Sequence, residues 1–199
     1  LLSQNKIRRF KMFTSIDTWG KRAEYIRDGL NVEVFERNLD YFMRNCEAPM
    51  VIMITFNIFS VTTFRTLLEK ILEWREKYND VDTHRWQRLG FDTPHLKEPL
   101  QYDMNILPKS YMSYMHDHLQ FIKENTDDSR KDAFSTIEYE KFRRVVDYME
   151  KTEYPLDRII QGRSDFHNFF AEQGRRRNVD HTSVFPEMKD FFNLCKEYV

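Results

Sequence analysis

The sequence predicts an α/β fold: half of a parallel βα sheet, as in a partial barrel, followed by a mostly helical C-terminal extension. In the first half, apolar runs typical of strands alternate with amphipathic helical stripes, the pattern of right-handed parallel crossovers. After about Pro99 only helical patterns follow. Glycine accounts for 5 of 199 residues, where average usage gives about 14, and 32% are charged, which favours long solvent-facing helices. We therefore expect a βαβαβ segment over residues 1–99 and a helical region over residues 100–199.

Three segments of the first half are predicted to be strands. They cover residues 7–16 (IRRFKMFTSI), 50–56 (MVIMITF) and, with the weakest pattern, about 84–91. The continuous apolar run at 50–56 is typical of a strand buried on both faces. Three parallel strands leave two unpaired edges, which either the helical region shields or strands outside this chain complete. We favour the second explanation, because the chain begins at Leu1 rather than at a methionine and is expected to be a fragment.

Apolar side chains at helical spacing predict the helices. In residues 32–45, Phe35, Leu39 and Phe42 recur at i, i+4 and i+7 and form one stripe. A second stripe marks residues 61–78. The second half carries signals of four further helices. Pro108 precedes an apolar stripe that ends near Ile122, and a capping box of Ser135 and Glu138 begins a helix that runs to Met149.

The last two predicted helices are rich in aromatic residues. Residues 156–173 form a helix with Ile159, Phe166, Phe169 and Phe170 on the core side, and Pro186 begins a helix that carries Phe191, Phe192 and Cys195.

The composition excludes several classes of protein. A net charge of −1, from 31 Lys+Arg against 32 Asp+Glu, argues against a polybasic nucleic-acid binder and against an acidic tail. No apolar run approaches the roughly 20 residues of a membrane span and no signal peptide opens the chain, so we expect a cytoplasmic protein without a membrane partner. Cys46 and Cys195 are too few for a disulfide framework or, alone, a four-thiolate metal site, and we interpret them as small, buried or half-buried apolar residues.

Polar side chains follow each predicted strand, at the carboxyl ends where parallel α/β folds bind ligands. They are Ser15 and Asp17, Asn57, and Asp92. Two interpretations have nearly equal weight: a ligand-binding rim, or the helix caps and turns that Ser, Asp and Asn often form. The segment after the first strand is predicted to be a loop and adds Arg27, either as a clamp for a carboxylate or phosphate or as a solvated surface residue.

Several segments resemble radical S-adenosylmethionine enzymes, and within them the subgroup with a shortened "twitch" C-terminal region. The matching segments extend over most of the chain: SIDTWG at 15–20, EYIR at 24–27, TFN at 55–57 with SVT at 60–62, DFHNFF at 165–170, RRR at 175–177 and VFP at 184–186. The resemblance implies a partial six-stranded barrel of which this chain supplies the second half. It also implies that Ser15 and Arg27 meet the ribose or the methionine carboxylate of S-adenosylmethionine, and that Asn57 lines the same pocket.

The chain departs from this family at the metal centre. The family needs three cysteines in a CxxxCxxC loop to hold a [4Fe–4S] cluster, and that loop is absent here, as is the glycine-rich strand end that grips the cofactor's amino group. S-adenosylmethionine and [4Fe–4S] are therefore expected in the intact parent, whereas this chain alone is expected to hold neither and to be non-catalytic. For the substrate side we assign Asp17, Asp92 and His95.

Two further groups have a structural and a functional interpretation. His116 and His118 would point about 200° apart on a helix, so we favour surface and core histidines over a metal site. The run 175–177 follows Gly174, a possible helix cap, where cations complement the helix dipole. Its alternative is a grip on an acidic substrate, a leader peptide or RNA; the neutral chain favours the structural interpretation.

Two hypotheses of function follow. The leading one makes the chain the C-terminal part of a radical S-adenosylmethionine enzyme that modifies a small molecule or peptide, with the missing N-terminal half as its partner. The alternative is a non-catalytic binding or assembly module that kept the scaffold and lost the cluster, with a partner protein covering the open sheet edge.

Overall fold

The computed structural model describes residues 9–79 and 87–199, and it confirms the α/β class. Its strands are β1 (Met12–Ser15), β2 (Met50–Met53) and β3 (Leu89–Asp92), and its helices are α1 (Lys21–Ile26), α2 (Val32–Asn45), α3 (Ser60–Lys77), α4 (Met112–Glu124), α5 (Thr136–Lys151), α6 (Leu156–Arg177), α7 (His181–Val184) and α8 (Lys189–Lys196). Short 3-10 turns lie at η1 (Leu100–Tyr102), η2 (Met104–Ile106), η3 (Lys109–Tyr111) and η4 (Pro186–Met188). Residues 7, 8 and 84–86 of two predicted strands lie outside the described residues.

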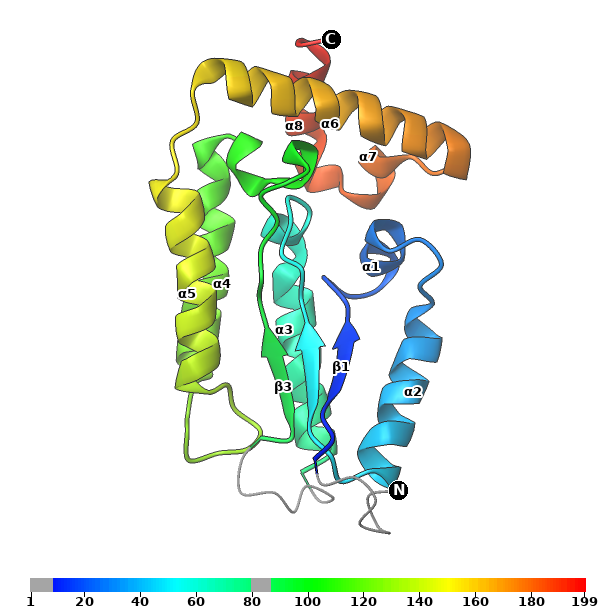
Figure 1. The fold of residues 1–199 in the computed structure, drawn as a ribbon, viewed down its shortest axis with the longest axis vertical. Helices are drawn as coiled ribbons and strands as arrows, with labels where there is room; N and C mark the ends of the chain where they lie inside the picture. Colours follow the sequence, from blue (N-terminus) through cyan, green and yellow to red (C-terminus); the bar gives the residue numbers. More distant parts are fainter. Residues whose placement is uncertain (1–8, 80–86) are drawn as a thin grey trace.

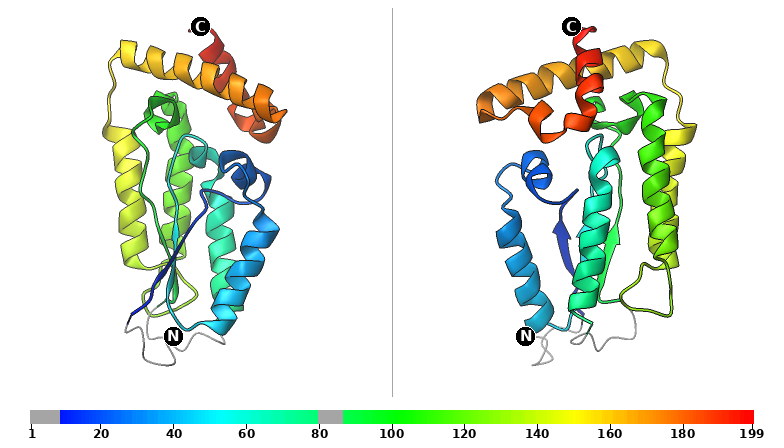
Figure 2. Two further views of the ribbon diagram at one scale, coloured as in Figure 1. Left: turned by 45° about the vertical axis from the view of Figure 1, so that its right-hand side comes forward. Right: turned by 180° about the vertical axis from the view of Figure 1, so that it is seen from behind.

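The described strands form one parallel sheet in the order β1–β2–β3. Helices α3 and α4 lie behind this sheet in Figure 1, and the view from the back in Figure 2 shows α2, α3 and α4 in front of it. The core gathers between these layers, where the rings of Phe56, Phe64 and Phe142 pack at centroid distances of 4.9–5.5 Å. Helix α3 contributes most to it, because its apolar stripe from Val61 to Trp74 is fully buried.

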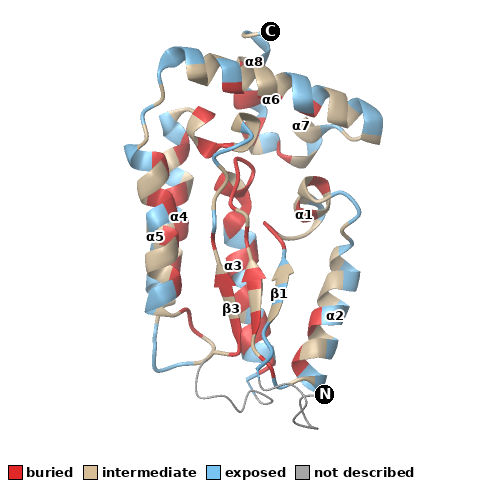
Figure 3. Cartoon of the chain, viewed as in Figure 1, coloured by how far each residue is buried: buried red, intermediate tan, exposed pale blue. Residues whose placement is uncertain are grey.

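The two faces of the sheet differ in burial. Met50, Ile52, Leu89 and Phe91 point toward the helices and are buried. Side chains of the other face are exposed or half-buried, as the alternating colours of β2 and β3 in Figure 3 reflect; they are Phe13 and Ser15 on β1, Val51 and Met53 on β2, and Gly90 and Asp92 on β3. The prediction of burial on both faces of the second strand is therefore wrong for Val51 and Met53, because α5, which contacts that face at Asp92 of β3, leaves them half-buried.

The outer edge of β3 is closed by a buried ion pair. Arg75 of α3 donates through Nε to the Leu89 carbonyl at 2.9 Å and through Nη2 to Glu138 Oε1 at 2.6 Å. The same Glu138 oxygen accepts the Phe91 amide at 3.0 Å. These are the backbone groups that a further strand would use, so β3 cannot extend the sheet on this side.

The outer edge of β1 is open among the described residues. The Met12 amide donates to Pro49 at 2.9 Å, toward β2. Because alternate residues of a parallel strand face opposite neighbours, the backbone groups of Phe13 and Ser15 point outward, and no described group pairs with them. Phe13 is also 57% exposed. The sheet thus has one edge that is closed and one that can accept a strand.

Helix α6 crosses above the carboxyl ends of the strands, roughly perpendicular to them (Figure 1). Its close approach to the η1–η2 segment depends on Gly162, where a Cβ atom would lie 2.5 Å from Ile106 Cγ2 and 3.0 Å from Leu100 Cγ. Arg163 donates to the Ile106 carbonyl at 2.9 Å beside it. One continuous cluster of buried apolar residues includes members from both halves of the chain, from Ile16 to Cys195.

We expect Gly162→Ala to lower the free energy of unfolding by about 1–2 kcal/mol, measured by urea titration. The clash with the η1–η2 side chains costs about 1–3 kcal/mol, and the better helix propensity of alanine returns less than about 1 kcal/mol. The matched control is Ala171→Gly, which changes an exposed position of α6 and reports the propensity difference alone. Unchanged or raised stability of Gly162→Ala would contradict the close approach.

Two predicted details are wrong. The segment after the first strand is not only a loop, because residues 21–26 form α1 between Gly20 and Gly29, which both adopt positive φ. The sixth helix does not end at Gln173, because it continues to Arg177 and Asn178 takes the left-handed conformation (φ 50°). Gly174 is inside the helix, so the residue that ends it is an asparagine, the other residue that tolerates this conformation.

Candidate functional site

The residues predicted to bind ligands all lie at or beyond the carboxyl ends of the strands, below α6. Ser15 and Asp92 are the last residues of β1 and β3. They lie in register through Met53, and both belong to the face of the sheet away from α3. Past the strand ends, Phe56 forms an isolated bridge with His95. The fold therefore brings the predicted segments to one edge, although most of their polar atoms already have partners within the chain.

Asp17 and Arg27 pair with each other. Arg27 donates through Nε to Asp17 Oδ2 at 2.7 Å and through Nη2 to Oδ1 at 3.0 Å. Asp17 Oδ1 also accepts the Thr55 amide at 2.9 Å, where the β1–β2 ladder ends. The carboxylate clamp predicted for Arg27 is thus filled by a carboxylate of the same chain. Burial raises the pKa of Asp17, although Arg27 and the Thr55 amide act in the opposite direction.

Replacing Asp17 with alanine is expected to lower the free energy of unfolding by about 1–3 kcal/mol, because the half-buried Thr55 amide and the Arg27 guanidinium lose their acceptor. Chemical unfolding followed by circular dichroism measures the change. Asp117→Ala, at an exposed position of α4, is the control and is expected to change stability by less than about 0.5 kcal/mol. Equal effects of the two substitutions would show that the Asp17 contacts contribute nothing to stability.

Asn57 is buried and forms a turn that leads into α3. Its side-chain nitrogen Nδ2 donates to the Thr55 carbonyl at 3.0 Å, and its side-chain oxygen Oδ1 accepts from the backbone amide of Phe59 at 3.0 Å. Ser15 differs, because its hydroxyl is exposed on the face of the sheet away from α3 and makes no hydrogen bond to a described residue. Among the side chains expected to bind cofactor, Asn57 has both polar atoms bonded, Arg27 keeps Nη1 after its two bonds to Asp17, and Ser15 keeps its whole hydroxyl.

Asp92 and His95 both contact α5. Asp92 accepts from Lys141 Nζ at 2.7 Å, and the ring of His95 lies 4.3 Å from the ring of Tyr148. The Nε2 atom of His95 is buried without a described partner, and burial lowers the pKa of this histidine. It is therefore neutral near pH 7.

A buried carboxylate next to His95 was not predicted from the sequence. Asp103 accepts the hydroxyls of Tyr148 at 2.8 Å and Tyr154 at 2.6 Å, and its other oxygen accepts the Asn105 amide at 2.8 Å. These contacts join the η1–η2 segment to α5 and the loop after it. The sequence gives little indication of this cluster, because the two tyrosines that bond to Asp103 follow it by 45 and 51 positions.

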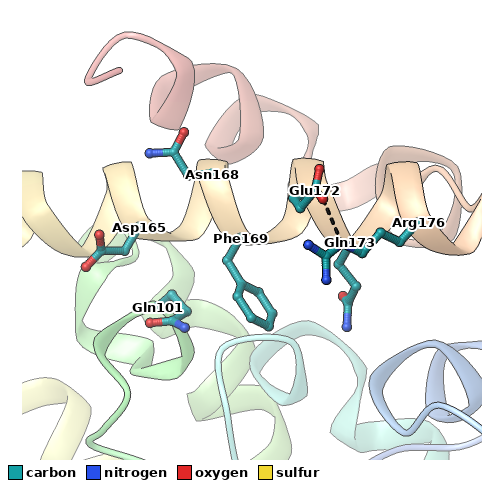
Figure 4. A pocket seen from close by; sticks show the side chains of 7 residues that line it. All are labelled: Gln101, Asp165, Asn168, Phe169, Glu172, Gln173 and Arg176. Atoms are coloured by element: carbon teal, nitrogen blue, oxygen red, sulfur yellow. Dashed lines mark hydrogen bonds and ion pairs between the residues drawn. The ribbon is translucent and has the colours of Figure 1, made fainter.

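A groove of about 590 Å³ lies between α6 and the loops at the strand ends. Figure 4 shows Phe169 and Gln173 pointing from α6 into this space, with Gln101 of η1 on the opposite wall. Phe169 is 41% exposed, whereas Phe166 and Phe170 on the same helix are buried. The prediction that Phe169 lies on the core side is therefore wrong, because the core stripe of α6 is narrower than the aromatic run suggests.

The three arginines of the run 175–177 have different contacts. Arg175 and Arg176 both pair with Glu172, at 2.7 and 2.6 Å. Arg177 donates to the Tyr25 carbonyl at 2.8 Å and lies 3.2 Å from Asp28, so it fastens the end of α6 to α1. This agrees with the structural interpretation of the run.

The two cysteines and the two histidines of α4 are not part of the group at the strand ends. Cys195 is buried in α8 and Cys46 is half-buried after α2, as expected. His118 is buried against the Val61 carbonyl, whereas His116 is exposed near Glu150. Within residues 9–79 and 87–199, no group of three His, Cys, Asp or Glu side chains is placed to hold a metal ion. No helix in the same ranges has the length and apolar character to cross a bilayer.

Comparison with family models, with curated proteins and with solved structures found no match for this chain. The fold and the contacts at the strand ends therefore carry the functional argument.

Proposed function

We propose that this chain is the C-terminal half of a radical S-adenosylmethionine enzyme that modifies a small molecule or peptide. The observation that carries the proposal is the asymmetry of the sheet edges. The β3 edge is closed by Arg75 and Glu138, whereas the edge of β1, the first described strand, is open. In the implied partial barrel, the N-terminal strands would precede β1 and pair at this open edge.

In this proposal the face of the sheet away from α3 becomes the inside of the barrel. Ser15 would then meet the ribose or carboxylate of S-adenosylmethionine. Arg27 has Nη1 left for the ligand after its two bonds to Asp17, and Asn57 would line the pocket as part of the turn that leads into α3. Asp92 and His95 remain on the proposed substrate side.

The residues of this chain do not fit an iron–sulfur cluster. The family's cluster needs three neighbouring thiolates, whereas Cys46 follows α2, Cys195 lies in α8, and the sequence has no third cysteine. The cluster ligands would have to come from the N-terminal half. With its free cysteines, the protein is proposed to function in a reducing compartment, the cytoplasm.

The test uses the polypeptide as its natural source makes it, isolated without oxygen and reconstituted with iron and sulfide. With a one-electron reductant such as dithionite added, we expect a longer chain that cleaves S-adenosylmethionine to methionine and 5′-deoxyadenosine, the hydrogen atom coming from the substrate or solvent. Ser15→Val is expected to weaken S-adenosylmethionine binding at least tenfold, and Ser113→Ala on the surface of α4 is the control. A polypeptide that contains no upstream cysteines and does not cleave S-adenosylmethionine would contradict the proposal.

A second function is favoured by one observation, the occupation of Arg27 by Asp17. If the same carboxylate remains bound in the natural protein, the cofactor's carboxylate has no clamp, and the chain acts as a non-catalytic binding or assembly module. Titration of the natural polypeptide with S-adenosylmethionine separates the two functions, because the module is expected not to bind it.

A further inference from the structure

We propose that the groove beneath α6 binds an extended, uncharged peptide segment of about five residues. That the peptide is a substrate rests on the proposed function, whereas the binding of a peptide in this groove does not. The argument starts from the shape of the groove. Its lining on α6 runs from Asp165 to Arg176, eleven positions, which is about 16 Å at 1.5 Å per residue. A strand rises about 3.3 Å per residue, so about five extended residues match this length.

The polar groups of the groove suit an amide backbone. Gln101 and Gln173 lie on opposite walls (Figure 4), and no hydrogen bond occupies either side chain within the described residues. The Gln173 oxygen is buried without a partner, an arrangement that costs free energy unless a ligand supplies the donor. A primary amide offers both donors and an acceptor, which is the complement of a peptide group.

The carboxylates of the groove already have hydrogen-bonding partners on α6. Glu172 is held by Arg175 and Arg176, and these two guanidiniums lower its pKa to about 2. Asp165 accepts from Gln161 at 2.7 Å. Together with Arg175, the two carboxylates of the groove are balanced by two guanidiniums, so the groove has no net charge that would favour an ionic ligand.

The aromatic ring of the groove provides an apolar contact at its centre. Phe169 lies between the two glutamines in Figure 4 and packs edge-on against Tyr102 at 5.8 Å. Its exposed area is available to one apolar side chain at the middle of the bound segment. This combination of a central apolar contact and flanking amides distinguishes the occupant from a polyanion or a metal complex.

The test measures fluorescence anisotropy of labelled, N-acetylated and C-amidated pentapeptide pools with the full 199-residue chain, the central residue being fixed in turn. We expect saturable binding of pools with an apolar central residue and no binding of pools with a central Asp or Lys. Gln173→Leu and Gln101→Leu are each expected to raise Kd at least tenfold, and Phe169→Ala likewise. Gln120→Leu, the same change on the exposed surface of α4, is expected to leave Kd unchanged.

Three results would overturn the proposal. The first is that no peptide pool binds. The second is that both glutamine variants bind as tightly as the wild type while their circular dichroism spectra remain native. The third is that the groove binds adenosine and not the peptides, which would make it a site for a heterocyclic ring. Failure here is distinguishable from failure of the proposed chemistry. If the protein binds peptides and does not cleave S-adenosylmethionine, the groove is a peptide site and the proposed enzyme activity is wrong. If it cleaves S-adenosylmethionine and binds no peptide, the enzyme activity holds and the peptide site is wrong.

Discussion

Replacing Glu138 with alanine is expected to lower the free energy of unfolding by about 3–5 kcal/mol, the largest effect of any single substitution considered for this chain. The side chains of Arg75 and Glu138 are only 2% and 6% exposed, so the arginine would remain as a buried, unpaired cation. The Phe91 amide and the Ser135 amide would lose their acceptors in the same step. Urea titration of the variant measures the loss.

Two further variants identify the cause of this loss. Glu138→Gln keeps an acceptor for the Phe91 amide and removes the charge, so an intermediate loss is expected. The double variant Arg75→Met with Glu138→Met is expected to stay destabilised, although an isolated buried ion pair often tolerates such a swap. The reason is that the Leu89 carbonyl and the Phe91 amide, which Arg75 and Glu138 satisfy, stay without partners. A double variant as stable as the wild type would contradict this account of the β3 edge.

Acidification from pH 7.5 to pH 4 is expected to remove about 3 kcal/mol of stability through His118 alone. Its Nε2 donates to the Val61 carbonyl at 2.9 Å, and its Nδ1 is buried without a described partner. Burial lowers the pKa of His118 from 6.5 to about 4. Below pH 6.5 the unfolded chain therefore takes up a proton that the folded chain does not, so stability falls as the pH drops from 6.5 toward 4.

Urea titrations at several pH values measure this dependence, and two variants isolate it from the other acidic groups. His118→Gln retains a donor for Val61 and is expected to lose less stability than the wild type over the same pH range. His116→Gln, at an exposed position two residues away, is expected to follow the wild type. Parallel curves for all three proteins would mean that His118 does not titrate differently in the folded chain.

The sequence predicted the elements with a strong apolar pattern and missed those without one. The stripes of α2 and α3 and the capping box of α5 appear where they were expected, because each signal is local. Helix α1 was missed, because its six residues are too few for a repeating stripe. Arg75 follows Ile71 by four positions, so the helical spacing alone places it on the buried stripe of α3. The burial of Arg75 was not predicted, because arginine is rarely buried.

The candidate site was predictable in position and not in its contacts. The strand-end rule placed Ser15, Asn57 and Asp92 at one edge, where they lie. The pairing of Asp17 with Arg27 depends on how α1 turns the chain back, and no local pattern specifies that turn. The groove was also beyond prediction, since it exists only because α6 crosses the strand ends and leaves Phe169 outside the core.

The central claim is that the sheet continues beyond β1 in the natural protein, and amide hydrogen exchange at Phe13 and Ser15 tests it most directly. The measurement compares the 199-residue chain with the polypeptide isolated from its natural source. In the 199-residue chain we expect fast exchange at both amides and slow exchange at Phe91, whose amide is bound by Glu138. In the natural polypeptide all three are expected to exchange slowly. Fast exchange at Phe13 and Ser15 in both proteins, with Phe91 slow, would show that no strand pairs with β1 and would contradict the account.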